Sequence, residues 1–307
     1  MSRLTRTLTG PLRAATSLRR RRESEWPRLP RPTISVGNLA LGGRGKTPLV
    51  AALAAQALVR GHRPAILLRG YPVVRRGGPP QLLQRSGPEE APWLTLLGAP
   101  VAPAHEHAWR VGDEAAWLAA VTGVPVVAHP DRVVAAHAAV RHDDRIDLFL
   151  LDDGLQTPVR ADVDVVLVDP ARDLPDAPRP AATRERVPPP GALLVPLGQE
   201  LRRRPGPLRN LAGQPARPPA PITVCAGVGD PGSVLRLAEE AGLAIRGAVA
   251  VRDHHAPRRI PPGPLLVTEK DAVGWAMRSR AECFVLGLTL DGADAVAARA
   301  FAALPPR

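Results

Sequence analysis

Residues 35–48 read Ser-Val-Gly-Asn-Leu-Ala-Leu-Gly-Gly-Arg-Gly-Lys-Thr-Pro, and this stretch decides the fold. It continues a β-branched run that begins at Thr33 and opens into an Ala/Leu/Val-rich helical pattern from Leu49 to Arg60. A strand, a glycine turn and a helix in this order place free backbone N–H groups at the positive end of a helix dipole, where they bind phosphate. The stretch therefore predicts a nucleotide-phosphate loop, and the alternative is an ordinary glycine turn beside a surface lysine.

Each residue type in this loop suits phosphate binding. The glycines let the backbone approach an anion closely, Lys46 adds a point charge, and Thr47 offers a hydroxyl to Mg²⁺. The full G-x-x-x-x-G-K-[ST] pattern requires glycine at position 40, where this chain has Ala40, but the Gly-Gly-x-Gly-Lys-Thr part is intact. The predicted nucleotide-binding residues are Gly42, Gly43, Arg44, Gly45, Lys46 and Thr47.

The composition indicates a large α/β protein. The 307 residues are enough for one large or two ordinary domains, and 45% hydrophobic with only 3% aromatic residues indicates a core of Ala, Val and Leu. No stretch reaches the ~18 consecutive apolar residues of a membrane span. Cys225 and Cys283 lie in apolar runs and offer no metal framework, which favours buried thiols in a reducing compartment, with a disulfide between them left open.

The net charge of +12 raises the question of an anionic partner. No aromatic residues interleave the basic clusters, so nucleic acid is not expected, whereas anionic lipid or an anionic substrate fits. Residues 1–31 carry leucines at three- and four-residue steps among arginines. This pattern predicts a basic amphipathic segment on an anionic membrane surface, and a disordered arginine tail is the alternative.

Strand-like and helix-like runs alternate from residue 32 to about residue 200. This alternation predicts an α/β fold with a mostly parallel sheet covered by helices, as in P-loop NTPases. Residues 171–220 are rich in Pro, Arg and Gly and read as extended loops, and a second β-α-β pattern begins after Pro221. The predicted organisation is an N-terminal segment, a P-loop domain and a smaller C-terminal α/β domain, at 1–31, 32–215 and 216–307.

Two places in the chain offer carboxylates for chemistry. The apolar run 146–151 ends in Asp152 and Asp153, and two adjacent acids at a strand end favour Mg²⁺, although the run could simply end in an Asp-Gly turn. Asp113 opens a helical pattern, where it is either an N-cap or a base that deprotonates an attacking hydroxyl.

Three further charged motifs are weaker. His254 lies in Asp253-His254-His255, which favours proton transfer between a histidine and a carboxylate over a metal site, with surface histidines as the alternative. Glu185 lies in Arg184-Glu185-Arg186, which reads as a solvated loop or as a site for an anionic substrate or a metal. Thr268-Glu269-Lys270-Asp271 is loosely similar to the base-reading motif of GTPases.

Taken together, these motifs resemble the tetraacyldisaccharide 4′-kinase family of lipid A biosynthesis. The matching segments run in family order from about residue 32 to 275. They are Val36 to Pro48, Arg69-Gly70-Tyr71, Val111 to Glu114, Pro130-Asp131-Arg132, Leu151 to Gln156, Arg184-Glu185, Gly227 to Pro231, Asp253-His254-His255 and Val267 to Ala272. Thr157 stands where family members usually have histidine, and an arginine-rich segment replaces the family's apolar N-terminal helix.

The resemblance implies a peripheral enzyme at the cytoplasmic face of the inner membrane. It would transfer the γ-phosphate of ATP to the 4′-hydroxyl of tetraacyldisaccharide 1-phosphate, a lipid disaccharide, to form lipid IVA. Lys46 and Thr47 would hold the phosphates and Mg²⁺, and Asp113, supported by His254, would be the base. The implied catalytic residues are Asp113, His254 and Lys46, and the implied metal and substrate shell is Thr47, Asp152, Asp153 and Glu185.

Two other functions remain open at this point. A P-loop ATPase or GTPase of the metallochaperone or partitioning type is opposed by Leu41, which stands where the partitioning ATPases have lysine, and by the lack of a Cys/His cluster. A basic nucleotide-sensing or nucleic-acid-binding protein is opposed by the lack of a recognition-helix or zinc-finger pattern.

Overall fold

The computed structural model describes residues 25–40, 43–70, 73–75, 77–86, 93–96, 102–173, 188–252 and 255–306. Four predictions from the sequence lie wholly or mostly outside these ranges: the N-terminal segment 1–31, Gly42, Glu185 and His254. Within the described ranges, no helix has both the length and the apolarity that crossing a membrane requires.

The chain forms two compact units, and each is built from separate parts of the sequence. The first unit comprises residues 1–69, 129–202 and 291–307, and the second comprises 70–128 and 203–290. Each unit therefore takes residues from both of the ranges, 32–215 and 216–307, that the sequence predicts as domains. The domain boundary between residues 215 and 216 therefore stays a prediction about folding units.

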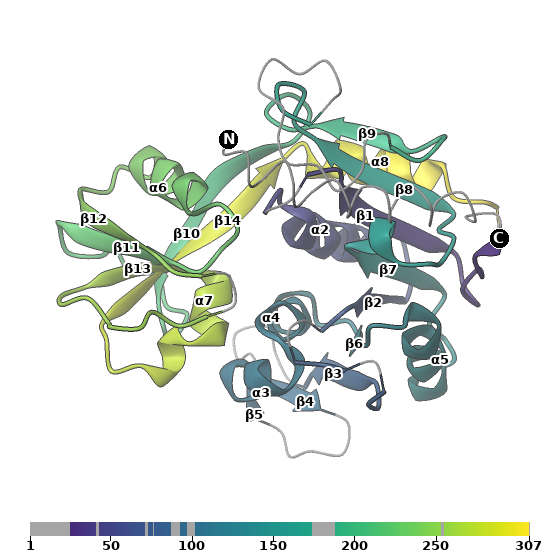
Figure 1. Ribbon diagram of the computed structural model, residues 1–307, viewed down its shortest axis with the longest axis horizontal. Helices are drawn as coiled ribbons and strands as arrows, with labels where there is room; N and C mark the ends of the chain where they lie inside the picture. Colours follow the sequence, from purple (N-terminus) through teal and green to yellow (C-terminus); the bar gives the residue numbers. More distant parts are fainter. Residues whose placement is uncertain are drawn as a thin grey trace, which may run out of the picture. The chain divides into compact units, whose positions relative to one another are not determined.

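The first unit contains a parallel sheet in the order β2-β7-β1-β8-β9 (Figure 1). Its strands are β1 (Thr33–Asn38), β2 (Pro64–Leu68), β7 (Leu148–Asp152), β8 (Val163–Val168) and β9 (Leu193–Pro196). Every residue of β1 is buried, as expected for a central strand covered on both faces. The predicted α/β fold with a mostly parallel sheet is confirmed.

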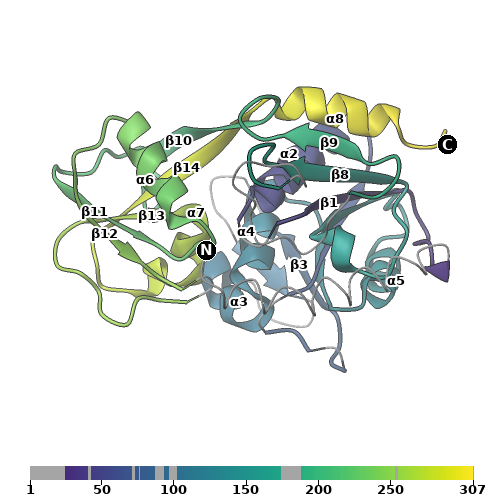
Figure 2. The ribbon, with the colours of Figure 1, turned by 45° about the horizontal axis from the view of Figure 1, so that its top comes forward.

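Helices of the first unit cover this sheet because their alanine- and leucine-rich faces need burial. They are α2 (Lys46–Val59), α5 (Arg132–His142) and α8 (Ala293–Ala302). The helix α2 buries Leu49, Leu53 and Ala57 against the sheet, and α8 packs against α2 and β9 (Figure 2). The helix α5 begins at an N-cap, Asp131, whose carboxylate accepts hydrogen bonds from the backbone N–H groups of Val133 and Val134.

The second unit contains three strands that the sequence did not predict, β3 (Gln81–Arg85), β4 (Trp93–Leu96) and β5 (Ala102–Pro103). With β6 (Val126–Ala128), which falls in a predicted strand run at 124–128, they pair antiparallel in the order β5-β4-β3-β6. Two helices, α3 (Ala104–Val111) and α4 (Asp113–Thr122), lie between β5 and β6 in the chain. His107 is buried in α3.

A second sheet completes this unit in the order β10-β14-β13-β11-β12. Its strands are β10 (Arg202–Asn210), β11 (Ile222–Ala226), β12 (Ile245–Ala250), β13 (Leu265–Thr268) and β14 (Cys283–Asp291), with helices α6 (Pro231–Glu240) and α7 (Glu269–Gly274). The strand β10 falls in the proline-rich range that reads as loops. Cys225 and Cys283 are buried free thiols, so the predicted burial is confirmed and the disulfide is excluded.

Candidate functional site

The glycine-rich stretch forms the connection between β1 and α2. The strand ends at Asn38 and the helix begins at Lys46, which confirms the predicted strand–loop–helix order. Gly45 is the N-cap with φ +88°, a conformation that side chains disfavour, so glycine is required there. The first turn of α2 contains no acidic residue and no side-chain cap. Among the residues that the structure describes, no side chain therefore caps its first N–H groups, as an anion site requires.

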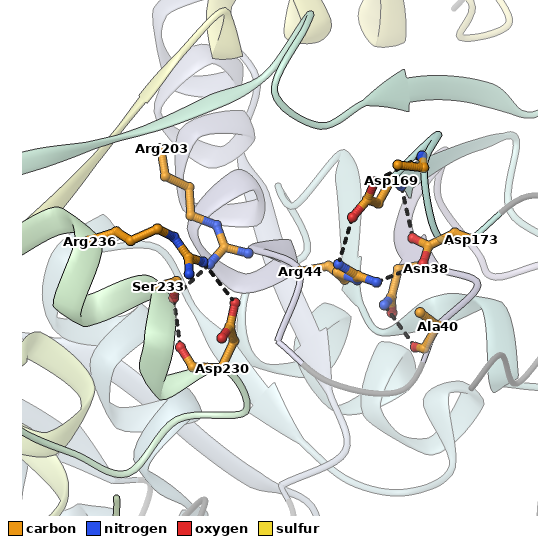
Figure 3. Close-up of polar contacts among 10 residues, drawn as sticks. Asn38, Ala40, Arg44, Asp169, Asp173, Arg203, Asp230, Ser233 and Arg236 are labelled. Atoms are coloured by element: carbon orange, nitrogen blue, oxygen red, sulfur yellow. Dashed lines mark hydrogen bonds and ion pairs between the residues drawn. The ribbon is translucent and has the colours of Figure 1, made fainter. Parts of the chain in front are cut away.

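Lys46 is held between an amide and a carboxylate. Its Nζ donates a hydrogen bond to Asn38 Oδ1 at 2.7 Å and forms an ion pair with Asp153 Oδ1 at 3.4 Å. Asn38 is buried, and its Nδ2 donates to the carbonyl oxygen of Ala40 at 2.9 Å (Figure 3). Asn38 therefore contacts both the start of the loop and the lysine at its end.

The sheet register brings the two predicted acids to this loop. The strand β7 runs parallel to β1 with Asp152 opposite Val36, so the carboxyl ends of both strands meet at one edge. Asp152 is buried, and its pKa is raised by desolvation, an effect opposed by Lys46 and by a hydrogen bond from the side chain of Thr47. Asp153 has φ +56°, a rare conformation for a non-glycine residue that occurs at functional turns.

A buried arginine supports the same acids. Arg132, at the start of α5, donates from Nη1 to the carbonyl oxygen of His129 at 2.7 Å and from Nη2 to that of Asp152 at 3.4 Å. Burial lowers the pKa of Arg132 to about 10, so it stays charged at neutral pH. The carboxyl end of β7 therefore lies between two cations, Lys46 and Arg132.

The donor set at the end of β7 fits a magnesium ion that shares its coordination with a phosphate. Asp152 Oδ1 is buried and accepts no hydrogen bond from the part of the chain that the structure describes. Among the same residues, no three His, Cys, Asp or Glu side chains are close enough together to hold a metal alone. Mg²⁺ typically takes one or two carboxylates and completes its shell with water and substrate phosphates. Thr47, Asp152 and Asp153 meet that requirement, and Glu185 stays a prediction.

Arg44 points to a different pair of acids. Its Nη2 contacts Asp173 Oδ1 at 2.7 Å and its Nη1 contacts Asp169 Oδ2 at 3.4 Å (Figure 3). Asp169 follows the end of β8, which pairs with β1 on the side opposite to β7. The loop between β1 and α2 thus has an acidic pair on each side, and its two cations are divided between them.

The second unit contains Asp113. Gly112 is the N-cap of α4, so Asp113 is the first helical residue and the N-cap alternative is excluded. Asp113 Oδ1 accepts a hydrogen bond from the backbone N–H of Glu114 at 2.9 Å, and Asp113 Oδ2 lies 3.9 Å from Lys270 Nζ. The Asp113 carboxylate therefore faces a cation supplied by α7.

Asp271 organises the loops around α7. Its buried carboxylate accepts hydrogen bonds from the backbone N–H of Gly227 at 2.9 Å, from Thr268 Oγ1 at 2.6 Å and from Trp275 Nε1 at 3.0 Å. A carboxylate engaged in this way is a structural centre. Asp271 of the Thr268-Glu269-Lys270-Asp271 motif therefore has a structural role within the second unit.

The turn that carries the predicted histidine lies beside this centre. The backbone N–H of His255 donates to the carbonyl oxygen of Arg252 at 3.0 Å. A Cβ on Gly227 would lie 2.8 Å from Asp271 Oδ1 and 3.1 Å from the carbonyl oxygen of His255. Three motifs far apart in the sequence therefore meet in one place, although His254 itself is outside the described residues.

Sequence reasoning assigned no role to Asn38, Arg132 or Lys270. All three belong to the motifs that carry the family resemblance, and that membership was the only available signal. Their contacts join residues from different strands and helices, which no local pattern reports.

Comparisons with known proteins agree with this architecture. A family model described as "Tetraacyldisaccharide-1-P 4′-kinase" matches residues 1–179. A tetraacyldisaccharide 4′-kinase of Bordetella parapertussis is 32% identical over 87% of this chain and 83% of its own length. One of Pseudomonas aeruginosa is 32% identical over 90% of this chain and 82% of its own length. A crystal structure of LpxK from Aquifex aeolicus in complex with ATP has a similar fold, with a TM-score of 0.68, 21% identity and coverage of 97% of this chain and 98% of that chain.

Proposed function

The chain belongs to the tetraacyldisaccharide 4′-kinase family, and on this premise we propose which of its residues carry the reaction. It is an ATP-dependent kinase of lipid A biosynthesis that phosphorylates the 4′-hydroxyl of a tetraacyldisaccharide 1-phosphate. The P-loop ATPase or GTPase alternative is not favoured.

The phosphates of ATP bind at the start of α2. The observation that carries this proposal is the position of Lys46 Nζ, 2.7 Å from Asn38 Oδ1 and 3.4 Å from Asp153 Oδ1, at the first residue of a helix whose first turn holds no acid. A lysine fixed at a helix N-terminus supplies charge where phosphate oxygens accept backbone hydrogen bonds. The backbone of Gly43 to Thr47 forms the described part of this cradle.

Thr47, Asp152 and Asp153 would hold Mg²⁺ beside the phosphates, and Glu185 would complete the acidic shell. When bound, the ion neutralises charge on the phosphate oxygens during transfer. Asp152 Oδ1 is buried and accepts no hydrogen bond from the described residues, which supports this proposal because an ionised carboxylate in such a place requires a cation. Arg132 fixes the end of β7 through the Asp152 carbonyl and keeps this carboxylate in position.

Asp113 is the general base. It accepts the proton of the 4′-hydroxyl as that oxygen bonds to the γ-phosphorus, while the bond from phosphorus to the leaving oxygen of ADP breaks. Lys270 Nζ lies 3.9 Å from Asp113 Oδ2, and His254 supports the proton affinity of Asp113. Such catalysis depends mainly on positioning and charge neutralisation.

The acceptor is a lipid, so the enzyme works at a membrane surface. We place it peripherally at the cytoplasmic face of the inner membrane, where the basic segment 1–31 contacts anionic headgroups. Binding to anionic vesicles should weaken as the salt concentration rises, because charges near a surface are screened.

A phosphoryl-transfer assay tests the proposal. Purified protein is incubated with labelled ATP, Mg²⁺ and tetraacyldisaccharide 1-phosphate in mixed micelles, beside a folded Lys46→Ala variant. We expect a bis-phosphorylated product that disappears in the variant. Equal activity of the two proteins would refute the phosphate-loop assignment, and ATP hydrolysis without lipid product would refute the acceptor.

A further inference from the structure

Arg44 is the one arginine of the glycine-rich loop, and its side chain pairs with acids other than the one that contacts Lys46. Because β1 lies between β7 and β8, the loop that follows β1 has the carboxyl end of a parallel strand on either side. Lys46 pairs with Asp153 after β7, and Arg44 pairs with Asp169 and Asp173 after β8.

Hydrogen bonds to the backbone hold the two acids around Arg44 in place. Asp173 Oδ2 accepts the backbone N–H of Asp169 at 2.8 Å, and the backbone N–H of Asp173 donates to the carbonyl oxygen of Asp169 at 2.8 Å. Asp169 Oδ1 accepts the backbone N–H of Ala171 at 3.1 Å. These bonds fix a tight turn whose remaining carboxylate oxygens, Asp173 Oδ1 and Asp169 Oδ2, face the guanidinium.

This ion pair is largely buried, so its loss should matter for the structure of the loop. The side chain of Asp173 is 0% exposed and that of Arg44 is 14% exposed. Removing one partner of such a pair leaves an uncompensated charge, whereas an exposed pair contributes little. The pair therefore holds the loop backbone at residue 44 against the end of β8.

We propose that Arg44 is a positioning residue of the phosphate loop: its guanidinium, bound by Asp169 and Asp173, fixes the loop backbone for ATP without touching the nucleotide. The proposal rests on the assignment of this loop to ATP. It implies that, of the two basic side chains of this loop, Lys46 contacts the phosphates. The charge of Arg44 is instead neutralised by Asp169 and Asp173. Pre-organised loops bind more tightly because less ordering remains to be done on binding.

Four variants separate positioning from direct contact: Arg44→Met, Arg44→Lys, Asp173→Asn and the double variant Arg44→Met/Asp173→Asn. For each, the Kd for ATP, the KM for ATP and kcat are measured with the full-length protein, together with its thermal unfolding. Arg145→Met is the matched control. Arg145 belongs to the same unit and also pairs with an aspartate, Asp143, but it is exposed and is about a hundred residues away from the loop in the sequence.

If Arg44 positions the loop, Arg44→Met and Asp173→Asn each raise the Kd and KM for ATP about tenfold, equivalent to about 1.4 kcal/mol, with a smaller change in kcat. The double variant is then no worse than either single variant, because both remove one interaction. Arg44→Lys recovers part of the affinity, and the Arg145→Met control matches the wild type.

If Arg44 contacted the nucleotide directly, the Asp173→Asn variant would behave in the opposite way. Asp173→Asn would then leave ATP affinity unchanged or improve it, since the arginine is released toward the phosphates, and this outcome overturns the proposal. If Asp173→Asn fails to fold, Asp169→Asn removes the more exposed partner, and unchanged ATP affinity in that variant counts against the proposal in the same way. Failure of the loop assignment is distinguishable, because a folded Lys46→Ala variant would then bind ATP like the wild type.

Discussion

Asn38 Oδ1 accepts a hydrogen bond from Lys46 Nζ at 2.7 Å, which links the last residue of β1 to the first residue of α2. The same amide donates to the carbonyl oxygen of Ala40 at 2.9 Å, so one buried side chain connects the two ends of the phosphate loop. Ala40 occupies the position where the full loop pattern has glycine. The amide of Asn38 thus fixes the backbone at the point where this chain departs from that pattern.

Replacing Asn38 by alanine should impair catalysis more than folding. The variant loses the acceptor that holds Lys46 and the donor to Ala40, so we expect kcat/KM for ATP to fall by about tenfold or more, equivalent to at least ~1.4 kcal/mol. Steady-state kinetics and thermal unfolding measure the two effects. Asn210→Ala is the control, since Asn210 bonds Gln214 at an exposed site. Wild-type kinetics in a folded Asn38→Ala variant would contradict the role of this amide.

Asp152→Asn should separate activity from stability. The amide has the shape of the carboxylate but lacks its charge, so we expect transfer to fall by at least about a hundredfold, as for loss of a major electrostatic contact. The variant no longer buries a charge at this position, and burying a charge is unfavourable. Its melting temperature should therefore equal or exceed that of the wild type. Asp147→Asn, at a partly exposed residue just before β7, is the control. A fully active Asp152→Asn enzyme would rule out the proposed metal site.

Asp113 and His254 should behave as one unit. If His254 supports the base, Asp113→Ala and His254→Ala each slow phosphoryl transfer, and the double variant is slower by less than the product of the two effects. His255→Ala provides the neighbouring control. The measurement is kcat at saturating ATP and lipid, and fully multiplicative losses would show that the two residues act independently.

Glu269→Gln should flatten the dependence of stability on pH. Burial raises the pKa of Glu269 above its ordinary value of 4.5, although Trp117 Nε1 donates to its carboxylate. A carboxyl that binds its proton more tightly in the folded state stabilises the fold at low pH, and this contribution is lost as the pH rises through the window above 4.5.

The glutamine variant retains an acceptor for Trp117 and has no proton to lose. We therefore expect its unfolding free energy, relative to that of the wild type, to increase as the pH rises from about 4 to 7, in the direction set by linkage. Denaturant unfolding across this range measures the difference. A difference that does not change with pH would contradict the raised pKa.

Gly227→Ala should destabilise the second unit. The new methyl group would lie 2.8 Å from Asp271 Oδ1 and 3.1 Å from a backbone oxygen, so we expect a loss of about 1–3 kcal/mol of unfolding free energy, typical of overpacking. Gly247→Ala in β12 is the matched control, because a Cβ there meets nothing within 4 Å. Equal stability of the two variants would contradict the close approach of Gly227 to Asp271.

Much of the first unit could be predicted from local patterns. Short runs rich in Val, Ile or Leu predicted β1, β7 and β8, since strands buried on both faces are continuous apolar runs. The antiparallel strands β3 to β5 and the arginine-rich β10 were not predicted. Strand formation depends on partners across the sheet more than on composition, and these segments carry few of the β-branched residues that mark a strand.

The sequence by itself determined the phosphate loop, the parallel α/β sheet and the acids at the end of β7, because glycine spacing and hydrophobic periodicity are local properties. Only the tertiary structure decided which basic residue forms an ion pair with which acidic residue. The order β7-β1-β8 brings together strand ends more than a hundred residues apart, and so assigns Lys46 to Asp153 and Arg44 to Asp173. Coulomb interactions act through space at distances of a few ångströms, and those distances are set by strand register, which no local sequence pattern encodes.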